Sequence, residues 1–301
     1  MEFLLPFRVS PENAEFGTDT GRLEERNGKE DKMSIVTISR GSYSQGETIA
    51  RKVAAKLGYE CLSREVLLEA SQEFNIPEVK LIRAIHDGPS ILDRFRYGKE
   101  KYISYIEAAI LKHVLKDNVV YHGLAGHFFL KDISHVLKVR VLADLEERVR
   151  REMAREGITY KEALGILKED DEQRKKWSKD LYGIDTSDPS LYDLVIHVKR
   201  VTADDAVEII IHTLRLPQFQ ATPDSQRALE DLALAAEVKA VLVGLKPDVE
   251  VTAKQGIVSI RLKAAESQES ALMRDLERSA KKIAGIKEVK FEVSPIAPFS
   301  D

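Results

Sequence analysis

The segment Ser34-Ile-Val-Thr-Ile-Ser-Arg-Gly-Ser-Tyr-Ser-Gln-Gly-Glu-Thr48 decides how the rest of the sequence is interpreted. Residues 34–39 are mostly β-branched or small and predict a buried strand that ends at Arg40-Gly41. From Gly46 to Leu57 the apolar residues recur every three or four positions, which predicts a helix that stops at Gly58. A strand that turns through glycine into a helix is typical of the opening of an α/β domain.

The turn between this strand and helix has the spacing of a phosphate-binding loop. Residues 41–48 match the template G-x-x-x-x-G-K-[ST] at every specified position except Glu47, which stands in place of lysine. Gly41 and Gly46 permit a tight backbone path, and the N–H groups of the loop and helix start can hold phosphate oxygens. Thr48 would offer its hydroxyl to Mg²⁺. A glycine-containing turn without any ligand remains the alternative.

Glu47 changes the electrostatics of this loop. It removes the cation expected beside the β- and γ-phosphates and puts a carboxylate there, which argues against ordinary ATP binding. Arg40 lies just before the loop, and Arg51 follows Glu47 by four positions. Because residues four apart on a helix are neighbours, we expect Arg51 to draw the Glu47 carboxylate away from the phosphates.

The pattern after residue 60 continues the α/β alternation up to residue 215. Strands are predicted at 118–122, 135–142 and 192–198, and helices at 63–86, 100–116 and 202–215. Parallel strands need crossover connections, so this alternation favours a parallel sheet with helices on both faces. The expected fold class is therefore α/β with three layers over residues 33–215.

A second, smaller domain is predicted at the C-terminal end. Residues 216–227 contain two prolines among mostly polar residues and are interpreted as a linker. The following pattern predicts a helix at 228–244, strands at 249–253 and 257–263, a helix at 266–284 and a strand at 287–293. The order αββαβ over residues 228–294 predicts a small α+β domain.

Composition limits the classes of partner and compartment. The net charge is −4, from 46 Lys and Arg against 50 Asp and Glu, so we expect no nucleic-acid partner. The single cysteine, Cys61, and the lack of a membrane-length apolar run favour the cytoplasm. Residues 1–32 are polar without periodicity and predict a disordered leader, and Met33 is an alternative start of translation.

Residues 34–215 resemble the cytidylate kinase-like family of P-loop nucleotide kinases. Ile35-Val-Thr-Ile-Ser-Arg-Gly-Ser-Tyr-Ser-Gln-Gly46 resembles the N-terminal signature of the family, in which the loop lysine is often absent. Asp180-Leu-Tyr-Gly-Ile-Asp185 and Asp188-Pro-Ser-Leu-Tyr-Asp-Leu-Val-Ile196 resemble the segment between the lid and the last strand. The resemblance implies ATP, Mg²⁺ and phosphoryl transfer to a nucleoside monophosphate or a related small acceptor. Leu124 stands where the family usually has an acceptor-binding arginine.

The same resemblance implies a set of site residues in the loop and in an arginine-rich lid. Nucleotide binding is expected at Arg40, Gly41, Ser42, Ser44, Gln45, Gly46, Glu47, Thr48, Arg155 and Asp171, with Thr48 also as the metal ligand. The catalytic residues are expected to be Arg148, Arg151 and Arg174. The alternative for the lid is a solvated pair of helices rich in Glu–Arg ion pairs, since glutamates alternate with these arginines.

The C-terminal segment resembles a BON domain. Ala236-Glu-Val-Lys-Ala-Val-Leu242, the hairpin around Gly256 and Ile283-Ala-Gly-Ile-Lys-Glu-Val289 carry this resemblance. It implies contact with a protein partner or a phospholipid surface, or assembly of copies of the chain into a homo-oligomer. The alternative to a kinase is therefore a degenerate nucleotide sensor whose BON-like domain transmits nucleotide binding to a partner, and a scaffold without ligand is a third hypothesis.

Overall fold

The computed structural model describes residues 34–40, 45–63, 98–123, 126–264 and 266–295, together with single positions between 66 and 74. The predicted leader, the alternative start at Met33 and most of the helix expected at 63–86 lie outside these residues. So do residues 41–44 of the predicted phosphate loop.

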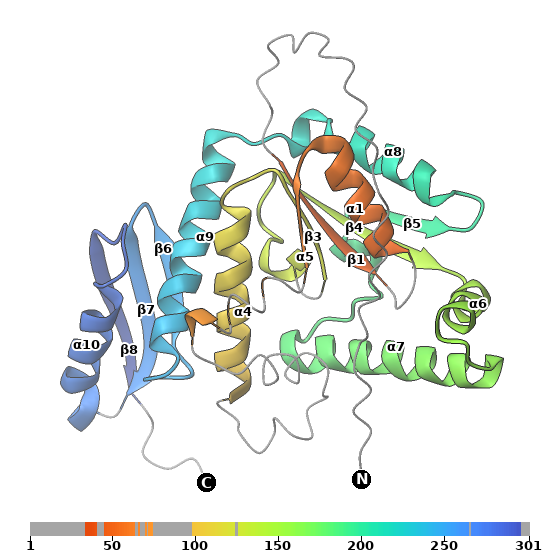
Figure 1. Ribbon diagram of the computed structural model, residues 1–301. Helices are drawn as coiled ribbons and strands as arrows, with labels where there is room; N and C mark the ends of the chain where they lie inside the picture. The colour runs from red at the N-terminus through yellow and green to blue at the C-terminus, as the bar shows by residue number, and fades with distance from the viewer. Residues whose placement is uncertain are drawn as a thin grey trace. The chain divides into compact units, whose positions relative to one another are not determined.

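A five-stranded parallel sheet forms the first part of the fold, in the order β2-β3-β1-β4-β5 (Figure 1). The strands are β1 (Ile35–Arg40), β2 (Glu60–Leu62), β3 (Val119–His122), β4 (Val136–Ala143) and β5 (Leu194–Val198). The predicted parallel sheet is confirmed, and β1 lies at its centre between β3 and β4. The sequence pattern missed β2, because three residues are too few to show a period.

Helices cover both faces of this sheet, as predicted for a three-layer fold. α1 (Gly46–Leu57) and α8 (Ala203–Leu214) pack on one face, and α4 (Gly98–Val114) and α5 (Gly126–Phe129) pack on the other (Figure 1). The alternation along β1 explains the division, because Val36 and Ile38 enter the α1/α8 core while Ile35 enters the α4/α5 core. Lys52 on α1 also contacts Asp204 on α8, with an Nζ–Oδ1 distance of 2.7 Å.

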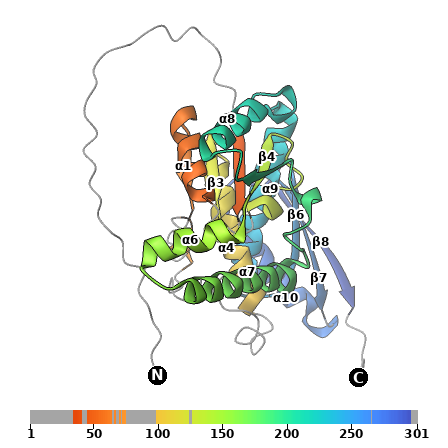
Figure 2. The same cartoon turned by 90° about the vertical axis from the view of Figure 1, so that its right-hand side faces the viewer.

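Two helices follow β4 and form a helical pair with its own small core. α6 (Leu145–Glu156) and α7 (Tyr160–Tyr182) lie side by side (Figure 2). Val149, Ala163 and Leu167 are fully buried between them. Thr159 caps α7, since its hydroxyl accepts from the N–H of Glu162 while the Glu162 carboxylate accepts from the N–H of Thr159. The short helix η1 (Pro189–Leu191) then leads into β5.

The C-terminal part has the predicted αββαβ order. Its elements are α9 (Pro223–Leu242), β6 (Glu250–Lys254), β7 (Ile257–Ala264), α10 (Glu266–Ala280) and β8 (Glu288–Pro295), preceded by η2 (Pro217–Phe219). β7 pairs antiparallel with β6 and parallel with β8. α9 begins earlier than predicted, inside the segment interpreted as a linker, because Thr222 caps it and Pro223 is favoured in the first turn.

α9 is shared by two hydrophobic cores. Leu229, Ala233, Ala236, Ala240 and Val243 are buried in the core that α4 forms with the first sheet. Val238 and Leu242 are fully buried against the three-stranded sheet β6-β7-β8. A helix that is apolar on two sides needs a partner on each. α9 therefore joins the C-terminal sheet to the core of the five-stranded sheet.

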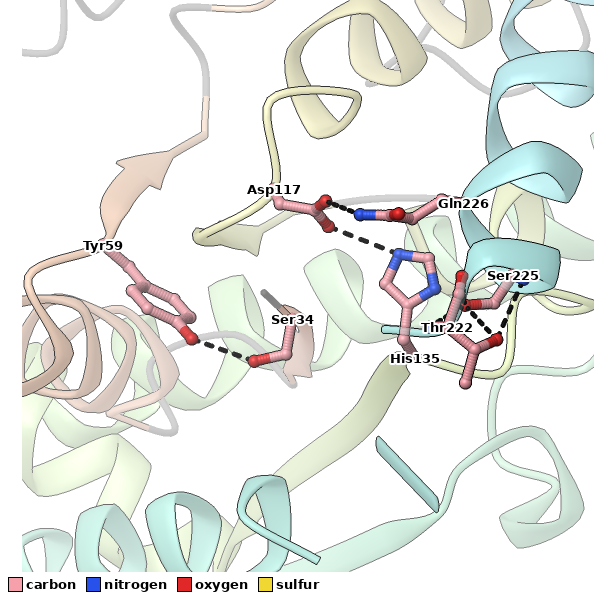
Figure 3. A network of polar contacts seen from close by, with 7 residues as sticks. All are labelled: Ser34, Tyr59, Asp117, His135, Thr222, Ser225 and Gln226. Carbon is pink, nitrogen blue, oxygen red and sulfur yellow. Dashed lines mark hydrogen bonds and ion pairs between the residues drawn. The ribbon is translucent and has the colours of Figure 1, made fainter. Parts of the chain in front are cut away.

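A buried polar network lies where α9 begins, just before the amino ends of β3 and β4 (Figure 3). The Asp117 carboxylate lies 3.3 Å from His135 Nε2, and Gln226 Nε2 on α9 approaches it at 3.5 Å. His135 is fully buried and the Asp117 side chain is 6% exposed. The Gln226 contact joins the start of α9 to the turn before β3, but neither ring nitrogen of His135 has a hydrogen-bond partner among the described residues, so the network is only partly satisfied.

We expect Leu229→Ala to destabilise the whole protein. Leu229 is 1% exposed in the core shared by α4 and α9, so the lost contacts and the remaining cavity should lower the free energy of unfolding by about 2–5 kcal/mol. Denaturant unfolding monitored by circular dichroism measures this change. The control Leu245→Ala changes a side chain that is 51% exposed and should have little effect. Equal stability of the two variants would contradict a shared core.

Candidate functional site

The carboxyl ends of the parallel strands meet at one edge of the sheet, and the chain leaves β1 there toward the predicted phosphate loop. β1 ends at Arg40, opposite Val141 of β4. Gly41, Ser42 and Ser44 of the predicted nucleotide site lie outside the described residues, as does the side chain of Arg40. In open α/β sheets ligands bind in the crevice at this edge, so the described residues around it define the candidate site.

The first turn of α1 is described from Gln45 onward. Gln45 has φ 67° and ψ 5°, a left-handed conformation that is uncommon for a residue other than glycine. Its side chain makes no capping hydrogen bond to the described residues of the helix. Gly46 is buried, whereas Glu47 and Thr48 are exposed. The first N–H groups of α1 are therefore left without a side-chain cap from Gln45, as an anion site at a helix start requires.

The predicted pair between Glu47 and Arg51 is confirmed. Arg51 Nη2 lies 3.1 Å from Glu47 Oε1, and the two side chains are 61% and 49% exposed. The contact runs along the outside of α1 and partly neutralises the carboxylate. An exposed pair of this kind stabilises a helix by only about 0.3–0.5 kcal/mol, so its main effect is on local charge.

Arg148 and Asp171 join the two helices of the predicted lid. Arg148 Nη2 lies 2.9 Å from Asp171 Oδ1 and 2.8 Å from Oδ2, and the Arg148 side chain is 9% exposed. The structure thus brings together a predicted catalytic arginine and a predicted nucleotide-binding aspartate. In this arrangement their charges hold α6 against α7.

The other predicted lid arginines also contact neighbouring side chains or backbone of the lid. Arg151 Nε lies 3.0 Å from Glu147 Oε1, and Arg155 contacts Glu152 and Glu156 at 2.9 and 2.8 Å. The backbone carbonyl of Arg174 accepts a hydrogen bond from Ser178. The described geometry therefore matches the ion-paired helix pair that the glutamate spacing predicts, and a lid function requires exchange of these partners.

A polar cluster on the α5 side of the sheet was missed by the sequence analysis. Its centre is the Tyr192 hydroxyl, which accepts from Arg140 Nη1 at 2.9 Å and donates to the Thr186 carbonyl at 3.0 Å. Ser39 Oγ and His127 Nε2 lie 3.3 and 3.2 Å from the same oxygen. The cluster joins β1, β4 and α5 to the segment that follows α7. Only the register of β1 with β4 reveals it, so sequence spacing carried no signal.

His127 is kept neutral by its surroundings. It is 4% exposed, and burial lowers its pKa from 6.5 to about 3, with further lowering by the charges of Arg140 and Lys138. The Asp193 carboxylate offsets the positive charge of Lys138, because it lies 3.8 Å from the side-chain amine. It also accepts a hydrogen bond from the backbone N–H of Lys138 at 2.8 Å. Arg140 and Lys138 therefore both contribute positive potential at His127, beside the larger effect of burial.

A second charged group lies at the carboxyl ends of β4 and β5. The Asp144 carboxylate contacts Lys199 Nζ at 2.5 Å and His197 Nε2 at 3.0 Å. The hydrogen bond from Lys199 holds the pKa of Asp144 below its usual value. The sequence analysis did not select Asp144, although an acidic residue directly after a parallel strand is a signal for this edge.

The predicted metal ligand is compatible with Mg²⁺, although one residue alone does not define a site. Thr48 is exposed in the first turn of α1, and its hydroxyl is a hard oxygen donor of the kind that Mg²⁺ prefers. Among the described residues, no three His, Cys, Asp or Glu side chains lie close enough to hold a metal ion together. Metal binding would therefore use Thr48 with substrate phosphates and water.

The sheet order and the position of the loop define a class of protein. A parallel sheet in the order β2-β3-β1-β4-β5, in which the glycine-containing segment follows central strand β1 and opens α1, is the arrangement of P-loop kinases. A model of the cytidylate kinase-like family matches residues 35–200, which is more than half of the chain. The chain belongs to this family.

Named relatives match the same part of the chain. A cytidylate kinase of Ignicoccus hospitalis is 29% identical over 180 residues, which cover 59% of this chain and 97% of the relative. A cytidylate kinase of Archaeoglobus fulgidus is 29% identical over 188 residues, which cover 62% and 97%. A solved structure of an uncharacterized protein from Eubacterium ventriosum is 24% identical, with a TM-score of 0.48 over 60% of this chain and 98% of that one.

We expect His127 to make folding sensitive to mild acid. Its folded pKa is below the unfolded value, so stability is fully present above pH 6.5 and falls as the unfolded chain becomes protonated. Between pH 6.5 and pH 5 the loss through His127 should be about 2 kcal/mol. Unfolding of the natural chain and of His127→Gln at both pH values measures the difference.

The exposed residue His212 provides a matched control for this measurement. His212→Gln should retain the acid sensitivity of the natural chain, whereas His127→Gln should lose part of it. The same pH dependence in His127→Gln and in the natural chain would show that His127 is not held neutral.

Proposed function

We propose that this protein is a nucleotide kinase that transfers a phosphoryl group from ATP to a nucleoside monophosphate or a related small acceptor. The observation that carries the proposal is the family match over residues 35–200, which spans the sheet from β1 to β5 and the α6/α7 pair. The names of the relatives from Ignicoccus hospitalis and Archaeoglobus fulgidus support a nucleotide as substrate.

In the proposed reaction, a phosphate oxygen of the acceptor attacks the γ-phosphorus of ATP. A new P–O bond forms as the bond from the γ-phosphorus to the β,γ-bridging oxygen breaks, and the electron pair leaves with ADP. Such a reaction depends on positioning and charge stabilisation rather than on covalent chemistry by the protein. The predicted loop, residues 41–48, would hold the ATP phosphates, and the arginines of α6 and α7 would stabilise charge on the transferred group.

The lid arginines are suited to different roles. Arg151 is exposed, and its ion pair among the described residues is with Glu147, so it can exchange this partner for a phosphate at little cost. Arg174 lies on α7 and is proposed to act with it. The Arg148 side chain is 9% exposed and that of Asp171 is 39% exposed, so leaving this partner costs the buried guanidinium more than an exposed pair would cost. We therefore assign Arg148 the role of positioning the two helices.

Mg²⁺ and ATP are the proposed cofactors. The Thr48 hydroxyl would hold the metal together with phosphate oxygens, and the metal would supply neutralisation of phosphate charge. Arg51 contributes by offsetting the charge of Glu47 in the same turn of α1. The residues that surround the nucleotide in this proposal are the predicted ones, Arg40, Gly41, Ser42, Ser44, Gln45, Gly46, Glu47, Thr48, Arg155 and Asp171.

A degenerate nucleotide sensor is the second candidate, and the structure offers one observation in its favour. A cavity of about 540 Å³ is lined jointly by α4, α5 and α9, with Glu107, Phe128 and Lys239 among its side chains. Burial raises the pKa of Glu107. A change in the first core would therefore reach α9 directly, and the BON-like domain of the proposal would pass it to a protein or lipid partner. No helix within the described ranges is long and apolar enough to cross a bilayer.

The two candidates make different predictions for the purified full-length chain with ATP, Mg²⁺ and each nucleoside monophosphate. A kinase forms ADP and a nucleoside diphosphate in equal amounts, which chromatography with ³¹P detection measures. Turnover should require Mg²⁺ and fall when Thr48 is changed to Val. Tight nucleotide binding in calorimetry without any diphosphate product would exclude the kinase and favour the sensor.

We expect Arg151→Met to lower kcat on the order of 10²-fold, because a donor to the transferred phosphoryl group is lost. Arg150 on the same helix is 71% exposed and provides the matched control, since Arg150→Met removes one positive charge from the same surface. Steady-state kinetics with saturating ATP compares the two variants. Equal kcat values for both would contradict the assignment of Arg151.

A further inference from the structure

The face of the sheet toward α5 carries polar side chains where a parallel sheet is normally apolar. Thr37 and Ser39 of β1 lie beside Lys138 and Arg140 of β4 in the strand register. Neighbouring residues of paired strands point to the same face, and strands buried on both faces are usually continuous apolar runs. These four side chains, which we call the polar stripe, therefore need an explanation other than packing.

The polar stripe contains groups that its neighbours satisfy only in part. Thr37 is 1% exposed, and its hydroxyl has no hydrogen-bond partner among the described residues. Ser39 is 7% exposed and contacts only the Tyr192 hydroxyl in the described hydrogen bonds. An unsatisfied buried hydroxyl is costly, which makes a ligand or water at this position favourable.

Arg140 is the charge that the polar stripe leaves uncompensated. Its guanidinium contacts the Tyr192 hydroxyl at 2.9 Å and lies 5.4 Å from the centre of the Tyr192 ring. No ion pair joins it to a carboxylate of the described residues, whereas the nearby Lys138 has Asp193. Only Nη1 is used in the contact with Tyr192, so the other N–H donors of the guanidinium can meet a second group.

The position of Arg140 places this charge at the candidate site. Arg140 pairs with Ser39, and the next pair in the register is Arg40 with Val141, after which the predicted phosphate loop begins. Arg140 lies on a central strand, which fixes the guanidinium more firmly than a loop would. The Tyr192 hydroxyl also holds the Thr186 carbonyl in the segment that leaves the α6/α7 pair.

We propose that Arg140, oriented by Tyr192 and close to His127, forms an oxyanion subsite that binds the phosphate group of the acceptor nucleotide. This proposal rests on the proposed kinase function for the identity of the ligand, but not for the chemistry of the subsite. The planar guanidinium suits two oxygens of one phosphate, and a half-buried location strengthens the interaction relative to water.

The low pKa of His127 is caused first by burial and then by the positive charges of Arg140 and Lys138, and the second cause agrees with an anion subsite nearby. A phosphate bound at Arg140 would cancel part of that potential. The imidazole NMR signals of His127 should therefore respond to an anion bound at Arg140, so His127 reports whether the subsite is occupied.

The test is a titration of the full-length chain with CMP, cytidine and inorganic phosphate, followed by the ¹H–¹³C NMR signals of His127. CMP and phosphate should shift these signals, whereas cytidine, which lacks the phosphate, should leave them unchanged. ATP, added separately, should not reproduce the shift if the subsite belongs to the acceptor. Unchanged His127 signals with millimolar CMP and phosphate would overturn the proposal, and so would an equal shift with cytidine.

Variants of Arg140 provide a second test of the proposal. Arg140→Met should weaken CMP binding in calorimetry on the order of tenfold, because a hydrogen-bonded charge contributes about one such factor or more. Arg140→Lys keeps the charge but not the planar pair of donors, so it should lose less affinity than Arg140→Met. Arg261→Met, which changes an exposed arginine of the C-terminal sheet, is the control and should bind CMP normally. Normal CMP binding by Arg140→Met, or equal losses in the Met and Lys variants, would overturn the assignment.

The outcomes for the subsite and for the kinase are distinguishable. If the chain binds CMP through Arg140 but transfers no phosphoryl group, the result supports the subsite and contradicts the kinase function. If Arg140→Met does not fold, as its near-UV circular dichroism would reveal, the His127 titration of the natural chain decides alone.

Discussion

The parallel pairing of β1 with β4 is the constraint on which the candidate site depends. It places Ser39 beside Arg140 and brings the ends of both strands to the edge where the phosphate loop is predicted. A cation in a sheet covered on both faces costs free energy unless other groups solvate it. The Tyr192 hydroxyl and ring supply part of that solvation, but no carboxylate of the described residues completes it. A group retained at such a cost is better explained by binding than by stability.

The C-terminal part packs against the part of the chain that matches the family more closely than its sequence suggests. The family match ends at residue 200, yet α9 buries Leu229 and Ala236 in the core that contains α4. The same helix buries Val238 and Leu242 against the C-terminal sheet. Cutting the chain before α9 would expose apolar surface on α4, so the two parts are energetically coupled. This coupling is the physical basis on which a nucleotide-dependent signal could reach the C-terminal sheet.

Local patterns predicted the fold well, whereas the site depended on contacts that sequence spacing does not contain. The parallel sheet and the αββαβ order follow from hydrophobic periods within single elements, and the Glu47–Arg51 pair follows from spacing on one helix. The start of α9 was misplaced because the cap at Thr222 lies in a proline-containing polar segment that resembles a linker. The contact of Arg140 with Tyr192 joins residues 52 positions apart. Predicting this contact requires the register between strands, which the hydrophobic period within a single element does not specify.

The location of the cations also determines which step each can serve. A lysine in a phosphate loop is a flexible point charge that can follow a transferring group, but here Glu47 and Arg51 occupy that turn and partly neutralise each other. Arg140 is fixed on a strand, so it suits a phosphate that stays in place, as the acceptor phosphate does while the γ-phosphoryl group moves. In the proposed reaction, the charge that develops on the transferred group would be met by the arginines of the α6/α7 pair. Arg151 can leave its exposed partner at little cost, while the pair of buried Arg148 with partly exposed Asp171 keeps the two helices together.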